Sequence, residues 1–209
     1  MNEITLRIAL PAGIVLFSCV ALVLPMVRHR RQHGTGTGFV IADVKDPVGR
    51  LVGYGMTLNS NLVGLHALLF AWLGGGPLSV VDVHPARGYV GIALMVLATS
   101  LIVTSQAELG RNWRMCIDEN RTDLVTSGLY QYVRNPIYTG TILLLLGVLT
   151  LAPGPWAVLL LVFGTYNVAL QARLEEAHLV KLHGDTYLAY ATKVGRFLPG
   201  VGRVSASAY

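Results

Sequence analysis

Five long stretches without a charged residue most constrain what this chain can fold into. The first three contain 20, 23 and 19 residues, and a helix needs about 20 apolar residues to cross the roughly 30 Å hydrocarbon core of a bilayer. The last two contain 16 and 17 residues and are separated by Pro153-Gly154-Pro155. The stretches are residues 8–27, 51–73, 89–107, 137–152 and 156–172.

These stretches predict an all-α integral membrane protein with five transmembrane helices. Hydrophobic residues make up 53% of the chain and charged residues only 13%, a composition typical of membrane proteins. Proline cannot continue a helix and glycine permits a reversal of the chain, so the last two stretches should form a helical hairpin.

The positions of the basic residues predict the orientation of these helices. With the N-terminus outside, every Lys and Arg except Arg7 and Arg87 falls in an inner segment, as cytoplasmic loops require. The C-terminus is then cytoplasmic. The net charge of +5 is explained by this topology and by anionic headgroups, so we expect no nucleic-acid partner.

Cysteine and histidine do not make a complete metal site. Cys19 and Cys116 lie in different segments, and among the six histidines only His29 and His33 have the i, i+4 spacing of a helical zinc site, which is too few ligands to hold a metal. We therefore expect neither a disulfide nor a metal.

The chain divides into two functional halves. Residues 1–106 form three transmembrane helices that contain little chemistry, although Asn59, Asn61 and His66 would either pack between helices or line a route for a substrate. Residues 107–200 contain two polar, tyrosine-rich segments on either side of the hairpin, and we expect them to form the catalytic region. Residues 201–209 are expected to be a flexible tail.

The sequence "GLYQYVRNPIYTG", residues 128–140, predicts the start of the fourth membrane helix. Asn135 is a preferred N-cap and Pro136 a preferred first helical residue. The next amides, of Ile137 and Tyr138, would then point outward at the positive end of the helix dipole, where a carboxylate or phosphate can bind.

Side chains around this helix start extend the predicted site. Arg134 adds a formal positive charge, and Tyr130, Tyr132 and Tyr138 add aromatic faces that can hold a cation or stack on a planar ring. Together they suit a ligand that is anionic, cationic and aromatic. The alternative is simple helix capping with an interfacial belt of tyrosines.

A second polar segment begins where the fifth apolar stretch ends. Glu175 and Glu176 stand just beyond that stretch, and because carboxylates are costly in lipid they should point into the protein, toward Arg173 or a bound cation. A structural salt bridge is the alternative. Gly184 is expected to end this helix, and a second short helix follows with Tyr187 and Tyr190 on neighbouring turns.

These two segments together resemble a known family. "DLVTSGLYQYVRNPIYTG" followed by "RLEEAHLVKLHGDTYLAYATKVGRFLPG" is similar to the isoprenylcysteine carboxyl methyltransferase and phospholipid methyltransferase group of integral-membrane enzymes, which use S-adenosylmethionine. The resemblance covers about residues 108–200. It implies a cytoplasmic cofactor pocket formed by the loop before helix four and the C-terminal helices.

The resemblance also implies roles for single residues. Arg173 would face the acceptor, and with Glu176 it forms the pair of candidate catalytic residues. Apart from the resemblance, Glu175 or Glu176 could serve as a general base if burial raised its pKa. The cofactor would be held by Leu124, Val125, Tyr130, Asn135, Pro136, Ile137, Tyr138 and Glu175.

Two positions differ from the family pattern. Asn135 stands where many relatives have histidine, which excludes a histidine base there. Gln171 stands where an arginine is expected in the prenylcysteine enzymes, which argues against a prenylcysteine carboxylate as acceptor.

The expected function is methyl transfer from S-adenosylmethionine to an acceptor dissolved in the membrane. The acceptor could be an isoprenylcysteine-type carboxylate, a lipid amine or a hydrophobic thiol, and the sequence does not decide among them or predict the oligomeric state. Two other hypotheses are a membrane reductase that uses NADPH and a non-enzymatic membrane component.

Overall fold

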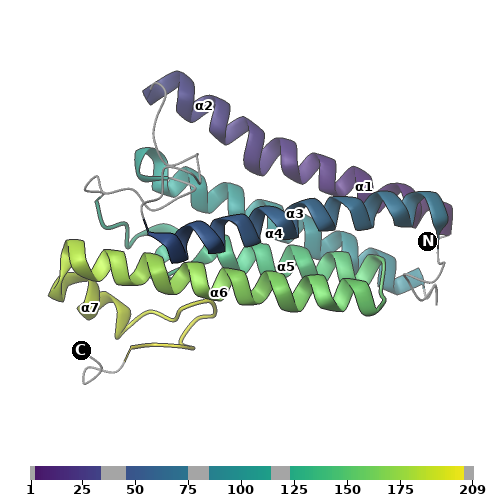
Figure 1. Ribbon diagram of the computed structural model, residues 1–209. Helices are drawn as coiled ribbons and strands as arrows, with labels where there is room; N and C mark the ends of the chain where they lie inside the picture. The colour runs from purple at the N-terminus through teal and green to yellow at the C-terminus, as the bar shows by residue number, and fades with distance from the viewer. Residues whose placement is uncertain (1–2, 34–45, 75–84, 114–122, 205–209) are drawn as a thin grey trace.

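The computed structural model describes residues 3–33, 46–74, 85–113 and 123–204. Within these ranges long helices lie alongside one another as a bundle (Figure 1). Four helices are long and apolar enough to cross a membrane, namely Glu3–Arg28, Pro47–Leu73, Ala86–Leu109 and Pro155–His183. The predicted all-α fold is therefore confirmed for the described residues, with four candidate membrane spans, whereas the fifth apolar helix expected to span, Pro136–Leu151, is shorter than a full span.

The first membrane helix is longer at both ends than the uncharged stretch that predicted it. It consists of α1 (Glu3–Phe17), a π-helical segment (Ser18–Val23) and α2 (Leu24–His33). The π-helical segment ends just before Pro25, which has no amide to donate to the preceding turn. The charged residues at both ends remain helical because they can reach water beyond the hydrocarbon.

The second and third membrane helices each begin at a proline. In α3 (Pro47–Leu73) the Asp46 side chain caps the helix by accepting from the amide of Gly49 at 2.7 Å, and Gly74 ends it with φ +67°. The next helix, α4 (Pro85–Leu109), is followed by a 3-10 turn at Gly110–Asn112. Both helices start before their uncharged stretches because proline suits the first helical position.

The predicted hairpin is present as α5 (Pro136–Leu151) and α6 (Pro155–His183). At 1.5 Å per residue, the 16 residues of α5 extend about 24 Å and the 29 residues of α6 about 43 Å. The second helix continues well past the apolar stretch and ends at Gly184, whose φ is +52°. A short helix, α7 (Asp185–Ala191), follows as expected.

Glycines allow α5 to lie close against α4. A Cβ on Gly140 would stand 2.5 Å from the side chain of Ile102, and one on Gly91 would stand 2.6 Å from the side chain of Leu151. Helices in lipid gain stability from such close packing because lipid tails are as apolar as the side chains. This pair of helices fixes the position of the α5 start.

Asparagine side chains and glycines also pack α3 against α6. The Asn167 side chain occupies the space over Gly55, and the Asn59 side chain occupies the space over Gly164. His66 is also buried, with Nε2 3.3 Å from the carbonyl of Ala152. Packing is therefore the role of Asn59 and His66.

Asn61 behaves differently from these two residues. It is exposed and donates to the carbonyl of Thr57 in its own helix at 2.9 Å. It takes no part in the packing between α3 and α6.

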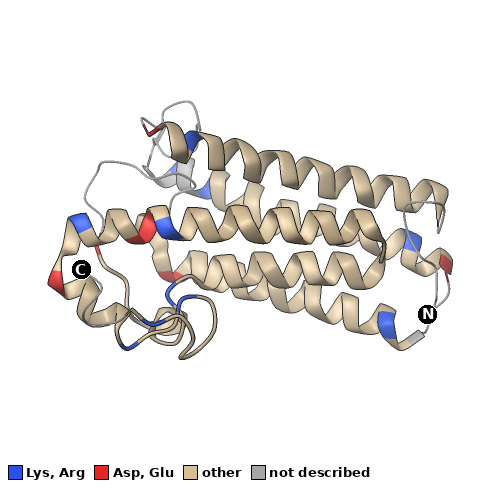
Figure 2. Ribbon diagram, turned by 60° about the horizontal axis from the view of Figure 1, so that its bottom comes forward, with Lys and Arg blue, Asp and Glu red and all other residues tan. Residues whose placement is uncertain are grey.

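Charged residues gather at the two ends of the bundle (Figure 2). One end holds the start of α1 and the end of α3, since Arg7 donates to the carbonyl of Ala71 at 2.9 Å. The α5–α6 turn lies at the same end, since the carbonyl of Ala152 contacts His66 on α3. The other end holds the α5 start, the α6 end and α7. Both tyrosine-rich segments therefore meet at one end of the bundle.

The chain after α7 folds back onto this end. The amide of Val204 donates to the carbonyl of Ala191 at 3.1 Å, and that of Arg196 donates to the carbonyl of Val201 at 2.8 Å. Residues 201–204 are thus part of the fold rather than of the expected flexible tail. The rest of that tail lies outside the described residues.

Candidate functional site

Asn135 and Pro136 occupy the predicted first positions of α5, but the asparagine side chain does not cap the helix. Its Nδ2 donates instead to Oε1 of Glu176 at 2.9 Å, and its backbone amide donates to the carbonyl of Arg196 at 3.1 Å. A buried carboxylate needs donors, and this requirement outweighs the capping preference of asparagine.

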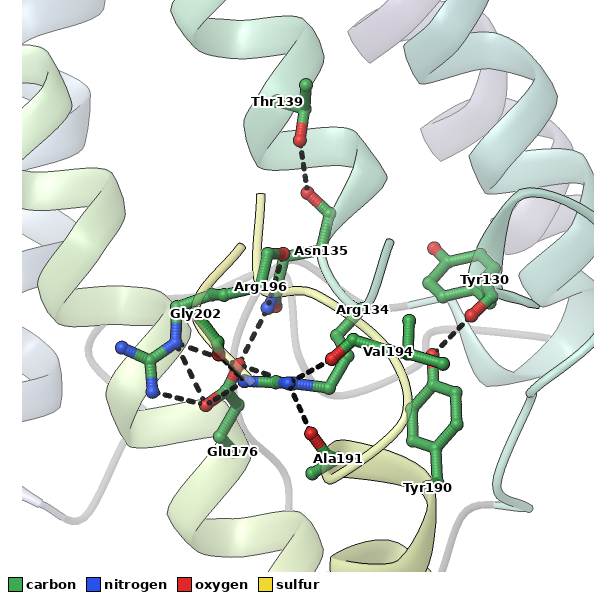
Figure 3. A network of polar contacts seen from close by, with 10 residues as sticks. All are labelled: Tyr130, Arg134, Asn135, Thr139, Glu176, Tyr190, Ala191, Val194, Arg196 and Gly202. Atoms are coloured by element: carbon green, nitrogen blue, oxygen red, sulfur yellow. Dashed lines mark hydrogen bonds and ion pairs between the residues drawn. The ribbon is translucent and has the colours of Figure 1, made fainter. Parts of the chain in front are cut away.

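Arg134 is buried in a network of polar contacts and ties the C-terminal segment to the α5 start (Figure 3). Only 1% of its side chain is exposed. Its guanidinium lies 3.2 Å from Glu176, and it donates to the carbonyl of Ala191 at 3.0 Å, to that of Gly202 at 3.1 Å and to that of Val194. The expectation that Arg134 adds charge to an anion site is therefore wrong.

Glu176 is the buried centre of this network. Arg196 donates to its Oε2 at 2.7 Å from the side opposite Arg134, so the carboxylate is shared by two guanidinium groups and the Asn135 amide. The salt-bridge alternative thus describes Glu176, with Arg134 and Arg196 as partners in place of Arg173. We call these four residues, Arg134, Asn135, Glu176 and Arg196, the arginine clamp.

Glu175, the neighbouring carboxylate, has a different environment. Its Oε1 accepts from the hydroxyl of Tyr138 on α5 and from Nε2 of Gln171 at 3.0 Å. Both donors are neutral, so the negative charge of Glu175 is solvated but not cancelled. Glu175 and Tyr138 are partly buried, and the two predicted segments meet through them.

Tyr130 lies on a 3-10 turn, Gly128–Gln131, held by the end of α4. The amide of Leu129 donates to Oε2 of Glu108 at 2.8 Å, and a Cβ on Gly128 would stand 2.2 Å from Glu108. Burial raises the pKa of Tyr130, and the negative charges of Glu175 and Glu108 raise it further. Tyr130 therefore stays a neutral phenol within the electrostatic reach of two carboxylates.

The other tyrosines divide between the site and the surface. Tyr190 donates its hydroxyl to the carbonyl of Tyr130, and burial raises the pKa of Tyr190 to about 12. Its ring centroid lies 5.9 Å from that of Tyr187 in an edge-to-face pair. Tyr132 is 60% exposed, so it is not part of the aromatic group.

The remaining sequence-predicted residues differ in how far they are buried. Leu124 and Val125 are partly buried in the loop before the 3-10 turn, and Ile137 is partly buried in the first turn of α5. Arg173 is exposed on α6. Since helical residues two apart lie on nearly opposite faces, Arg173 and Glu175 do not point into one space.

Three residues that contact this site were not among the site residues predicted from the sequence. Gln171 lies on the same face of α6 as Glu175 because it precedes it by four residues, a signal that was available. Glu108 ends an apolar stretch as Glu175 does, which is a weaker signal. The sequence around Arg196 gave no such signal, because only the fold of the loop after α7 places Arg196 next to Glu176.

The arrangement suits recognition of a cation with a polar, aromatic body. An uncancelled carboxylate attracts positive charge, and neutral tyrosine rings can hold a cation on their faces. The polar groups belong to the start of α5 and the end of α6, where apolar helices give way to charged loops.

Comparison with known proteins places this region in context. Residues 86–186 match the family model described as phospholipid methyltransferase. This range includes α4 after its first residue, all of α5 and α6, and all of the sequence-predicted site residues. The resemblance inferred from the sequence is therefore confirmed.

Curated relatives are similar at low identity. The chain is 26% identical over 117 residues to a protein-S-isoprenylcysteine O-methyltransferase of Dictyostelium discoideum, covering 54% of this chain and 49% of the relative. It is 30% identical over 112 residues to the enzyme of the same name from Schizosaccharomyces pombe, covering 52% and 48%. It is 32% identical over 82 residues to a methanethiol S-methyltransferase of Crocosphaera subtropica, covering 38% and 31%. The chain spans about half or less of the length of these relatives.

Proposed function

We propose that this chain, which matches the phospholipid methyltransferase model over residues 86–186 and is similar to isoprenylcysteine O-methyltransferases, transfers a methyl group from S-adenosylmethionine to an acceptor dissolved in the membrane. The observation that carries the proposal is the contact of Tyr138 and Gln171 with Glu175, which joins the start of α5 to the end of α6. When bound, S-adenosylmethionine supplies a methyl group already activated on a sulfonium.

Glu175 is the proposed contact for the positively charged part of this cofactor. Its carboxylate is partly buried and has neutral donors, so a cation would find its charge uncancelled. Tyr130 and Tyr138 would add aromatic surface on either side. Leu124, Val125, Asn135, Pro136 and Ile137 complete the proposed pocket through the loop and the α5 start.

Glu176 is better explained as a positioning residue than as a general base. Both of its oxygens accept from the arginine clamp, so neither is available to take a proton from an acceptor. By holding Arg134 and Arg196, it fixes the α5 start against the end of α6. The distance between Tyr138 and Glu175 depends on this fixation, and alignment of reacting groups can lower a barrier by about 7 to 11 kcal/mol.

An acceptor that is already ionised would need no base in this site. If a base is required, Glu175 fits better than Glu176 because no guanidinium holds it. Arg173 is exposed on α6, two residues before Glu175, where it suits contact with the headgroup of an acceptor. A lipid amine, an isoprenoid-linked carboxylate and a hydrophobic thiol all remain candidate acceptors.

The proposed topology has five membrane crossings, with α5 as the short fourth one. Its close packing against α4 and its turn into α6 support a crossing, although about 24 Å is less than the thickness of the hydrocarbon core. Of the 16 Lys and Arg residues, only Arg7 and Arg87 fall in segments that this topology places outside, and this bias supports an outer N-terminus. Residues 1–106 then form the N-terminal helices, residues 107–200 the catalytic region, and the site faces the cytoplasm.

Calorimetric titration of the detergent-solubilised protein with S-adenosylhomocysteine tests the cofactor. We expect saturable binding by the native chain, and a loss of at least tenfold in affinity for Glu175→Gln, the change that about 1.4 kcal/mol of lost interaction produces. Arg173→Gln is the matched control on the same helix, and it should bind as the native chain does. Absence of binding to the folded native protein would overturn the proposal.

The acceptor is tested with methyl-labelled S-adenosylmethionine and membrane extracts. We expect label in a lipid-soluble product, with Arg173→Gln raising the KM for the acceptor more than it lowers kcat. Separate trials with lipid amines, carboxylates and thiols would then identify the acceptor class.

A further inference from the structure

The segment after α7 forms a tight turn with an apolar tip that nothing in the described structure covers. Leu198 is 56% exposed and Val201 is 61% exposed. The amide of Val201 donates to the carbonyl of Leu198 at 3.1 Å, and Gly200 has φ +77°, which closes the turn. We call residues 197–201 the apolar turn.

The apolar turn is fixed to the first turn of α5. The hydroxyl of Thr139 donates to the carbonyl of Phe197 at 2.7 Å, next to the bond between Asn135 and the carbonyl of Arg196. After α7 the chain doubles back along the bundle to reach this point before it returns (Figure 1). The turn therefore lies at the level of the α5 start rather than out beyond the end of α6.

The short length of α5 places that level at the edge of the bilayer. With its far end at one hydrocarbon boundary, α5 extends about 24 Å toward the other, which is roughly 30 Å away. Its first turn then lies at or just inside the second boundary. By the same measure α6 reaches this boundary near Glu175, and its last turns project beyond it.

Part of the backbone of the apolar turn is hydrogen-bonded within the protein. The carbonyls of Phe197, Leu198 and Val201 each accept a hydrogen bond, from Thr139, Val201 and Arg196 respectively. Pro199 has no amide to leave unsatisfied. Because only paired backbone groups can enter lipid, the apolar side chains of the turn are the part suited to insertion.

Basic residues flank the apolar turn. Lys193 and Arg203 are exposed, and the guanidinium of Arg203 lies 3.5 Å from where a Cβ on Gly200 would stand. Apolar side chains between cations suit the boundary between acyl chains and phosphate headgroups.

We propose that Leu198 and Val201 insert into the leaflet on the side of the candidate site, with Lys193 and Arg203 at lipid phosphates. The turn is joined to the arginine clamp through Arg196, so lipid holds in place the same segment that Arg134 and Glu176 bind from within the protein. This inference rests on the proposed topology, in which α5 crosses the membrane, and does not depend on the proposed methyl transfer.

An environment-sensitive fluorophore on single cysteines tests this inference. Leu198→Cys and Val201→Cys are made with Cys19→Ser and Cys116→Ser, labelled with a nitrobenzoxadiazole dye, and reconstituted in vesicles of phosphatidylcholine and phosphatidylglycerol. Thr186→Cys, exposed on α7 beyond the end of α6, is the matched control. Both test sites are exposed, so neither substitution removes a core contact.

We expect emission from both test sites to be blue-shifted and several-fold less quenched by iodide than emission from the control. We also expect quenching by phosphatidylcholine that has a doxyl group high on its acyl chain. Emission and iodide quenching equal to the control would overturn the inference. Protection from iodide without quenching by the doxyl lipid would also overturn it, since protein, including a second copy of the chain, would then cover the turn.

Discussion

Replacing Glu176 with glutamine should destabilise the fold, because it leaves a buried guanidinium without its counter-charge. Removing one partner of a buried ion pair costs about 3 to 5 kcal/mol. The lower end applies, because Arg134 keeps its three carbonyl partners and 28% of the Arg196 side chain is exposed. A loss of about 3 kcal/mol corresponds to a more than hundredfold change in the folded-to-unfolded ratio.

The loss is measurable as a thermal shift of the solubilised protein. For a domain of 150 to 250 residues, about 3 kcal/mol lowers the melting temperature by roughly 6 to 12 °C. Glu175→Gln is the control, because the glutamine oxygen can still accept from Tyr138 and Gln171, and it should shift the melting temperature by less than about 3 °C. If the Glu176→Gln protein has the same melting temperature as the Glu175→Gln protein, the assignment of a structural role to Glu176 is refuted.

Three further changes test the packing and the site. Gly55→Ala should lower the melting temperature in a thermal-shift assay, by the equivalent of about 1 to 3 kcal/mol, because the new Cβ would stand 2.2 Å from Asn167. Gly64→Ala is the control, since its Cβ would meet nothing within 4 Å and should not destabilise the fold. Gly195→Ala should loosen the C-terminal segment, since its Cβ would stand 2.0 Å from a backbone oxygen, and faster proteolysis there would report it. Tyr138→Phe should weaken S-adenosylhomocysteine binding in calorimetry several-fold without a large thermal shift, since it removes one hydroxyl donor.

The helices were predicted well from the sequence, because an uncharged stretch whose helical length matches the thickness of the hydrocarbon core is expected to form a membrane helix. Each predicted stretch became a helix, and the proline and glycine residues between 152 and 156 made the turn. The boundaries were less accurate. Residues such as Arg50 and Arg87 were taken as limits of the apolar stretches, yet charged residues at helix ends stay helical once their side chains reach water.

The site was predicted in its members more than in its contacts. Spacing along the chain brought the α5 start and the α6 end together, and Tyr138 and Glu175 do meet. The partners of Arg134 could not be predicted, because carbonyls of Ala191, Val194 and Gly202 bind it through tertiary structure alone. No periodic pattern in the sequence specifies such backbone acceptors.

The adjacent glutamates show how one helix can separate structure from chemistry. Successive residues on α6 point about 100° apart, so Glu176 faces two guanidinium groups while Glu175 faces only neutral donors. The first arrangement cancels the charge and locks three segments together, and the second leaves the charge available to a ligand. Because the clamp holds the helix from which Glu175 projects, a rigid site and an uncancelled carboxylate can coexist. If the two carboxylates had each other's surroundings, neither the rigid site nor the uncancelled charge would be present. Ligand binding should therefore respond to substitution of Glu175, and the stability of the fold to substitution of Glu176.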